Sequence, residues 1–187
     1  MIKKIFSVIL SILLIALICV SFATTYKQNR TGTVSAAICD ISNENKEYII
    51  NNYDDCETVE ELIVRLNDEI CTEYTYHRPL IIFQSFDFDK FVKTKKGLCF
   101  DYACYLKAVF NITFPEVKVY VCDVRAGLFN FHSYNFIETE THRYFVDLTT
   151  DQYRYKNNQK RIVYEDIGTL SYHEYASRYN EYILNFH

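Results

Sequence analysis

Residues 97–110 read GLCFDYACYLKAVF, a glycine followed by a largely apolar run whose pattern predicts a helix that begins at Leu98. Cys99 falls in the first turn of this helix, where unpaired amide groups and the helix dipole lower the pKa of a thiol. Cys104 lies about 140° further around the helix and is predicted to be a buried structural thiol. Asp101 lies about 200° from Cys99, so we expect it to stabilise the helix start rather than to transfer protons. Cys99 is the candidate nucleophile, and a structural thiol is the alternative when it is taken alone.

The segments on either side of this helix predict an α+β domain. Upstream, Thr58 and Glu61 match a capping box that begins a helix from Val59 to Tyr74. An irregular aromatic stretch from Phe83 to Phe91 follows. Further upstream, residues 34–38 are a candidate short strand. Downstream, the pattern predicts strands at 117–124, 128–138, 143–149 and 161–165, a polar loop at 150–160 and a helical tail at 172–184. Helices followed by hairpin-connected strands indicate an α+β fold with an antiparallel sheet.

Two predicted strands carry the remaining candidate residues. His132 lies in the strand 128–138, and Asp147 lies on the next strand. A hairpin that turns at Thr139 and Glu140 would place His132 directly opposite Asp147, with their Cβ atoms about 5 Å apart. A carboxylate at that distance holds an imidazole in one tautomer. Thr-Glu is not a favoured hairpin turn, so a wider loop that keeps the same register is the alternative to that turn. The alternative is two polar residues on a solvated face.

These three residues together satisfy the needs of a thiol nucleophile. A cysteine requires a base that takes its proton and later returns it to the leaving group. The base in turn requires a group that orients it. Cys99 on a helix, with His132 and Asp147 on adjacent strands, would supply all three, so the sequence predicts a cysteine–histidine–aspartate triad.

Three segments resemble motifs of the transglutaminase-like superfamily. Residues 97–103 resemble the family's Gly-x-Cys-x-Asp-Tyr-Ala motif, residues 132–134 its His-Ala-Trp segment, and residues 144–149 the segment that ends in Asp-Pro-Thr. The order and spacing of the segments also agree with the family. The resemblance covers about residues 93–150.

The resemblance implies that Cys99, His132 and Asp147 are the catalytic triad. It also implies the family's papain-like α+β core, in which the catalytic helix packs on an antiparallel sheet. Tyr134 stands where the family often has Trp, and Leu148 where it often has Pro. The stretch after the helix lacks the family's Gly-Ile-Pro-x-Arg pattern. These departures leave the triad intact and affect the region that shapes the cleft.

The expected activity is thiol-dependent acyl transfer on peptide or protein amide bonds, through a thioester intermediate. Attack by water would make the protein a cysteine peptidase or amidase, and attack by an amine would make it a transglutaminase; hydrolysis is favoured for a small single-domain chain. The amide of Cys99 is one candidate oxyanion donor, and Gln84 is a weaker second. The alternative is a catalytically silent transglutaminase-like module that binds a peptide or cell-envelope polymer. No cofactor or metal is expected, because Cys-x-x-Cys and His-x-x-x-His spacings and acidic calcium loops are absent from the sequence.

The first residues predict export. Lys3 and Lys4 precede an almost wholly apolar run from Ile5 to Ala23, the layout of a secretory signal peptide. Small residues favour cleavage after Ala23, and an uncleaved membrane anchor is the alternative because the run approaches the length of a span. The predicted organisation is a signal peptide or anchor at 1–23, a polar N-terminal segment at 24–57 that is a tether or a loosely attached start, and a transglutaminase-like domain at 58–187. The protein is therefore expected to be secreted or anchored on the outer face of the cytoplasmic membrane.

Composition and charge limit the partners. The net charge is −4 and basic residues form no long run, which argues against nucleic acid as a partner. The expected partner is a peptide or protein substrate, with membrane contact only through the N-terminal hydrophobic segment. Removal of that segment would leave the cysteines Cys39, Cys56, Cys71, Cys99, Cys104 and Cys122. An even number in an exported chain suggests disulfides. However, a catalytic Cys99 must stay a thiol, so at least one of the others is expected to be unpaired.

Overall fold

The structure is a computed structural model that describes residues 13–15, 33–35, 41–77, 86–125, 131–171 and 174–175. The helices are α2 (Asn43–Tyr53), α3 (Val59–Glu73), α4 (Phe88–Thr94), α5 (Cys99–Thr113) and α6 (Leu148–Lys156). The strands are β1 (Thr33–Ser35), β2 (Thr75–Tyr76), β3 (Lys96–Gly97), β4 (Lys118–Arg125), β5 (Phe131–Glu138), β6 (Arg143–Val146) and β7 (Glu165–Asp166). The fold is α+β, as the sequence predicted. No helix in the described part of the chain is long and apolar enough to cross a membrane.

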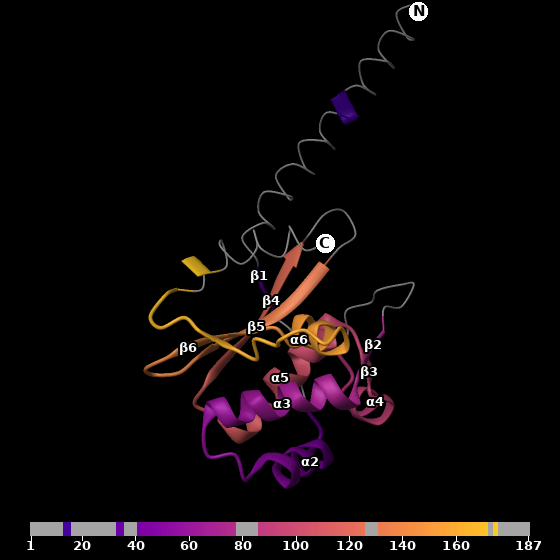
Figure 1. Ribbon diagram of the computed structural model, residues 1–187. Helices are drawn as coiled ribbons and strands as arrows, with labels where there is room; N and C mark the ends of the chain where they lie inside the picture. Colours follow the sequence, from indigo (N-terminus) through magenta and orange to yellow (C-terminus); the bar gives the residue numbers. More distant parts are fainter. Residues whose placement is uncertain are drawn as a thin grey trace, which may run out of the picture.

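An antiparallel sheet forms one layer of the molecule. Its strand order is β1-β4-β5-β6-β7, so β5 lies at the centre (Figure 1). The short strands β2 and β3 pair separately and in parallel, directly before the start of α5. Strand β3 leads into the first residues of α5, and the central strand β5 carries His132.

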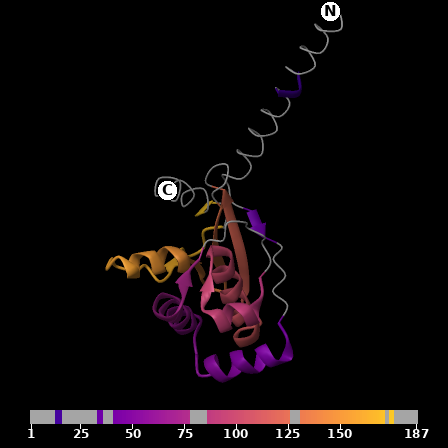
Figure 2. The ribbon, with the colours of Figure 1, turned by 90° about the vertical axis from the view of Figure 1, so that its right-hand side faces the viewer.

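Helix α5 lies against the sheet, and Figure 2 shows α3 and α6 beyond it. A helix with apolar residues on most sides is expected to be covered on most sides, and Tyr102, Leu106 and Val109 are each 0 % exposed. These three residues belong to the main hydrophobic core, which also contains Ile137 of β5. Phe136, its neighbour in sequence, packs into a smaller apolar cluster on the opposite face of the sheet, as strand alternation requires.

Helix α3 confirms the predicted capping box. The amide of Glu61 donates to Thr58 Oγ1 at 3.2 Å, and the amide of Thr58 donates to Glu61 Oε2 at 3.3 Å. The helix ends at Glu73, one residue before the predicted end. Local capping chemistry and apolar spacing agree here, so the sequence signal was sufficient.

The prediction for residues 143–160 was wrong after Val146. The strand ends at Val146 instead of Thr149, and α6 occupies most of the predicted polar loop. This helix is polar on most of its surface, with Leu148, Asp151 and Gln152 as its buried residues. It therefore lacks the apolar periodicity that the prediction relied on.

The polar N-terminal segment contains the candidate strand and a helix that was not expected. Strand β1 pairs with β4 and overlaps the predicted strand at 34–38. Helix α2 is capped by Ser42, whose Oγ accepts from the amide of Asn45 at 3.2 Å. Ile49 and Tyr53 are 0 % and 2 % exposed and belong to the main core. Residues 43–53 are therefore packed structure rather than a tether.

Two further predictions differ in extent. Part of the irregular aromatic stretch forms α4, which is capped by Asp87 and buries Phe88 and Phe91. The strand predicted at 161–165 is reduced to β7. The helical tail predicted at 172–184 lies almost wholly outside the described residues, as does most of the segment 1–23.

Candidate active site

Cys99 is the first residue of α5, where the helix start is held by a carboxylate. The backbone N–H of Leu98 donates to Asp101 Oδ2 at 2.9 Å, so Asp101 stabilises the helix start, as predicted. Burial raises the pKa of the Asp101 carboxyl group. Cys99 is 5 % exposed, and its amide belongs to the first turn, where N–H groups lack intrahelical acceptors. Cys99 therefore lies at the positive end of the α5 dipole.

Gly97 is required by the close packing that precedes Cys99. A Cβ atom at this position would lie 2.5 Å from Phe91 Cε2 and 2.9 Å from Asp101 Cβ. The carbonyl of Gly97 also accepts from the amide of His77 at 2.8 Å, which ties β3 to β2. The glycine of the motif therefore lets α4, β3 and α5 approach one another closely.

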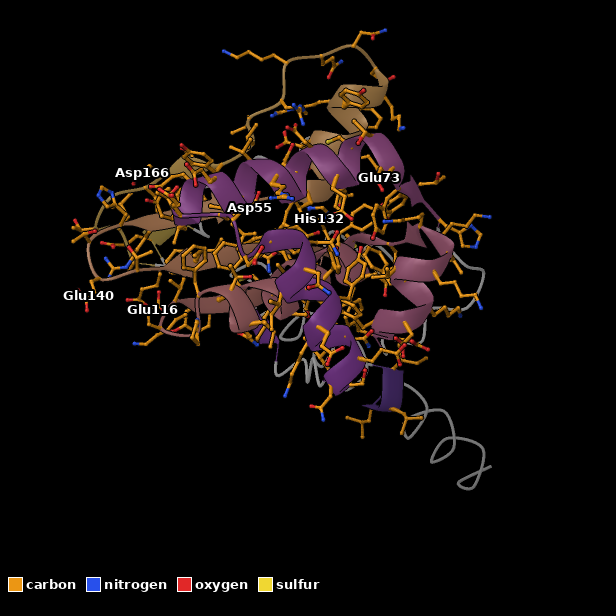
Figure 3. The ribbon with its side chains drawn as sticks, turned by 90° about the horizontal axis from the view of Figure 1, so that it is seen from below. Asp55, Glu73, Glu116, His132, Glu140 and Asp166 are labelled. Carbon is orange, nitrogen blue, oxygen red and sulfur yellow. The ribbon has the colours of Figure 1, made fainter. Side chains whose placement is uncertain are left out.

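His132 lies on β5 beside the point where β6 ends. The β5–β6 ladder stops at the pair Asn135–Val146, three residues before it would reach His132. Its Nε2–H donates to Asp147 Oδ2 at 2.7 Å. The two side chains are 7 % and 6 % exposed, and Figure 3 shows His132 well inside the outline of the molecule, with Glu140 near its margin.

The predicted register between these strands was wrong, although the predicted pair forms. The ladder pairs Glu138 with Arg143, so residues 139–142 form the connection and His132 does not stand opposite Asp147. The difference amounts to two residues, and a slip of two leaves each side chain on its own face. His132 and Asp147 are diagonal neighbours, and they meet because Asp147 lies just past the strand end.

Asp147 is also the N-cap of α6. Its Oδ1 accepts from the amide of Thr150 at 3.0 Å, and its Oδ2 accepts from Thr150 Oγ1 at 2.7 Å. One carboxylate therefore caps a helix and holds the imidazole of His132. Sequence reasoning missed Thr150, although an aspartate three residues before a hydrogen-bonding residue is a recognisable helix-start signal.

Cys99 contacts His132, and this contact completes the predicted group. The Cys99 side chain hydrogen-bonds to the imidazole. Because Nε2 is bonded to Asp147, Nδ1 is the nitrogen left for the sulfur. Burial lowers the pKa of His132, but Asp147 and, to a smaller extent, Cys99 outweigh burial and raise the pKa to about 10. The raised pKa favours the protonated imidazole, which lies between the sulfur and the carboxylate.

The other candidate residues lie apart from this group. Cys104 is 0 % exposed and packs with Phe100, Ala103 and Val121, as expected of a structural thiol. Gln84 falls outside the described residues. Within the described ranges, no group of three or more His, Cys, Asp or Glu side chains is placed to hold a metal ion.

A second buried polar cluster has a structural role. Asp151 is 3 % exposed and accepts from the amides of Ile162 and Val163 at 2.8 and 2.7 Å. It also accepts from Asn67 Nδ2 at 2.8 Å. Asp151 of α6 therefore links the loop after α6 to α3. These hydrogen bonds explain why the carboxylate is buried, and they indicate a structural role.

Comparison with known proteins adds no relative: no family model, curated protein or solved structure matches this chain. The geometry of the residues therefore carries the functional argument.

Proposed function

We propose that this protein is a thiol-dependent acyl-transfer enzyme that acts on peptide or protein amide bonds. The observation that carries the proposal is the hydrogen-bonded series Cys99–His132–Asp147, assembled from a helix start, a central strand and a strand end. A nucleophile, a base in contact with it and a third group that orients the base is the arrangement expected of covalent catalysis.

In the proposed reaction, the Cys99 thiolate attacks the carbonyl carbon of an amide. The C–N bond of the resulting tetrahedral intermediate breaks, and the leaving nitrogen takes the proton that His132 Nδ1 holds. A thioester and a free amine result. Asp147 keeps Nε2 protonated throughout, so Nδ1 is the position that gives and receives the proton.

The thioester is then resolved by a second nucleophile. His132 takes a proton from water or from an amine, which attacks the thioester carbonyl and expels the Cys99 thiolate. Water yields an acid, and an amine yields a new amide. We favour hydrolysis, because the described α+β domain is small and offers little additional surface with which to bind an amine cosubstrate.

The proposal extends to family and location. The chain would be a member of the transglutaminase-like superfamily with its papain-like core, supported by the sequence motifs and by α5 lying on an antiparallel sheet. It would be secreted or anchored outside the cytoplasmic membrane, which rests on the sequence of residues 1–23. An enzyme placed there would meet extracellular peptides and proteins.

Thiol alkylation tests the proposal, with Cys56 as an internal reference. An ordinary thiol is only a few per cent thiolate at pH 7, so a thiolate–imidazolium pair should react with iodoacetamide on the order of ten times faster. Cys56 is half-buried whereas Cys99 is buried. Faster labelling of Cys99, slowed in His132→Gln, would therefore reflect activation rather than access. Labelling of Cys99 no faster than Cys56 would refute the catalytic proposal.

A peptide assay separates the two outcomes of the thioester. The chain is incubated with a mixed peptide library, with and without a labelled primary amine, and the products are identified by mass. Cleavage alone indicates hydrolysis, and incorporation of the amine indicates transfer. Cys99→Ala is the matched control and should abolish both products. A reactive Cys99 that gives neither product would instead favour the silent binding module.

A further inference from the structure

Thr150 contacts the catalytic carboxylate with two groups at once. Its amide donates to Asp147 Oδ1 at 3.0 Å and its hydroxyl to Oδ2 at 2.7 Å. His132 Nε2 donates to the same Oδ2, also at 2.7 Å. The hydroxyl of Thr150 and the imidazole of His132 therefore share one acceptor atom.

The neighbouring threonine shows that this contact is specific to Thr150. Thr149 Oγ1 is buried and has no hydrogen-bond partner among the described residues. Thr149 is also the residue that the sequence motif places in the Asp-Pro-Thr position. The two threonines lie in the same turn of α6, yet only the second one bonds to Asp147 among the described contacts.

We propose that Thr150 is a positioning residue of the Cys99–His132–Asp147 site, which fixes the rotation of the Asp147 carboxylate and limits its hold on His132. This inference rests on the proposed function. Two donors from one residue, one to each oxygen, fix the plane of a carboxylate better than a single bond does. A hydroxyl on Oδ2 also reduces the electron density that this oxygen offers to the imidazole.

The consequence is a directional effect on His132. Removing the hydroxyl leaves His132 as the remaining described side-chain donor to Oδ2, so the carboxylate stabilises the imidazolium more strongly. The amide bond to Oδ1 persists and keeps the carboxylate in place. The titratable groups that also act on this pair include Cys99 from α5, Asp151 from α6 and Tyr175. They are unchanged by the substitution.

The test is a nuclear magnetic resonance titration of the His132 ring in the full chain, with Cys99→Ala as the background so that thiol titration does not interfere. The signal is assigned from its absence in His132→Gln. Thr150→Val removes the hydroxyl at nearly constant shape, and Thr150→Ser restores it. Thr149→Val is the matched control, because it deletes a buried hydroxyl that bonds to none of the described residues.

We expect Thr150→Val to raise the titration midpoint of His132 by roughly 0.3 to 1 pH unit, while Thr150→Ser and Thr149→Val stay near the parent. An unchanged or lowered midpoint in Thr150→Val would overturn the proposal, as would an equal rise in Thr149→Val. Loss of thermal stability without a change in midpoint would reduce Thr150 to a structural role. Because the readout does not require a reactive thiol, its failure is distinct from failure of the alkylation test.

Discussion

The substitution Asp147→Asn separates the two roles of this residue. Asparagine is as good an N-cap as aspartate, so α6 should keep its start. The negative charge that holds the imidazolium of His132 is lost. The comparison is made in a Cys99→Ala background, which removes the titration of the thiol from the measurement.

The sign of the effect follows from the pKa of His132. Its folded-state pKa, about 10, lies above the ordinary histidine pKa of 6.5 that applies to the unfolded chain. The stabilisation is therefore complete below pH 6.5 and is lost as the pH rises through the folded pKa. One proton changes the free energy of unfolding by at most about 1.4 kcal/mol per pH unit. Cys99 supplies part of the raised pKa, so we expect a loss of about 2–4 kcal/mol across this window in the background chain.

Asparagine at position 147 should reverse this dependence. Burial alone lowers the pKa of His132, so the imidazole would stay neutral in the folded state above pH 6.5. Its contribution to stability would then be flat at alkaline pH and would decline on acidification, as the unfolded chain takes up the proton. The change of sign is more diagnostic than the absolute stability of the variant.

Urea denaturation between pH 5 and 10.5 measures the effect. The matched control is Asp87→Asn, since Asp87 caps α4 through the amide of Lys90 at 3.0 Å and is not hydrogen-bonded to a described histidine. Asp87→Asn should retain the parent's pH dependence. The same alkaline slope in Asp147→Asn as in the parent, or its loss in both variants, would refute the assignment of the ion pair.

Three other substitutions test the framework of the site. Gly97→Ala should destabilise the fold by about 1–3 kcal/mol in thermal or urea unfolding, because its Cβ would lie 2.5 Å from the ring of Phe91. Gly97→Ser should lower the free energy of unfolding by at least as much. Asn135→Leu removes a buried donor to the carbonyl of Ala103 at 3.0 Å. It should lower the free energy of unfolding by about 1–3 kcal/mol in urea and slow the alkylation of Cys99. A stable variant with unchanged alkylation would contradict this prediction. Asp151→Ala leaves buried amides unpaired and should lower the free energy of unfolding by about 2–4 kcal/mol. Limited proteolysis should then begin in the loop after α6. Cleavage elsewhere would argue that Asp151 does not hold this loop.

The parts of the fold that the sequence predicted are those in which short-range signals agree. Helix α3 has a capping box and apolar spacing, and α5 has a nearly continuous apolar surface after Gly97. Strand β4 alternates between buried and more exposed residues, and β5 is rich in aromatic residues, which favour strands. In each case a local signal indicates the element without tertiary information.

The elements that the sequence missed are polar ones whose stability depends on distant partners. Helix α6 buries Gln152, whose Nε2 donates to the carbonyls of Ile70 and Tyr74 at 2.8 and 2.9 Å. Helix α2 buries Tyr53, whose hydroxyl lies 2.7 Å from that of Tyr105. Such bonds pair residues far apart in sequence, so no local period reveals them.

The candidate site was predicted for a partly wrong reason, and the difference is informative. The three residues are those named from the sequence, but the register that was used to pair His132 with Asp147 is not the one observed. The predicted contact between His132 and Asp147 still forms because the error was two residues, which preserves the face of the sheet. An error of one residue would have put His132 on the other face.

The site is built from the ends of elements, and this explains how a buried group is held in place. Cys99 begins α5, and Asp147 follows the last residue of β6 and begins α6. Backbone N–H groups at helix starts have no intrahelical acceptor, so the amides of Leu98 and Thr150 are available to bind the carboxylates of Asp101 and Asp147. Each carboxylate fixes the helix start that it caps. Because Asp147 also binds His132, the folding of α6 and the orientation of the imidazole depend on the same atoms, and a change that frays the start of α6 should be detected first at His132.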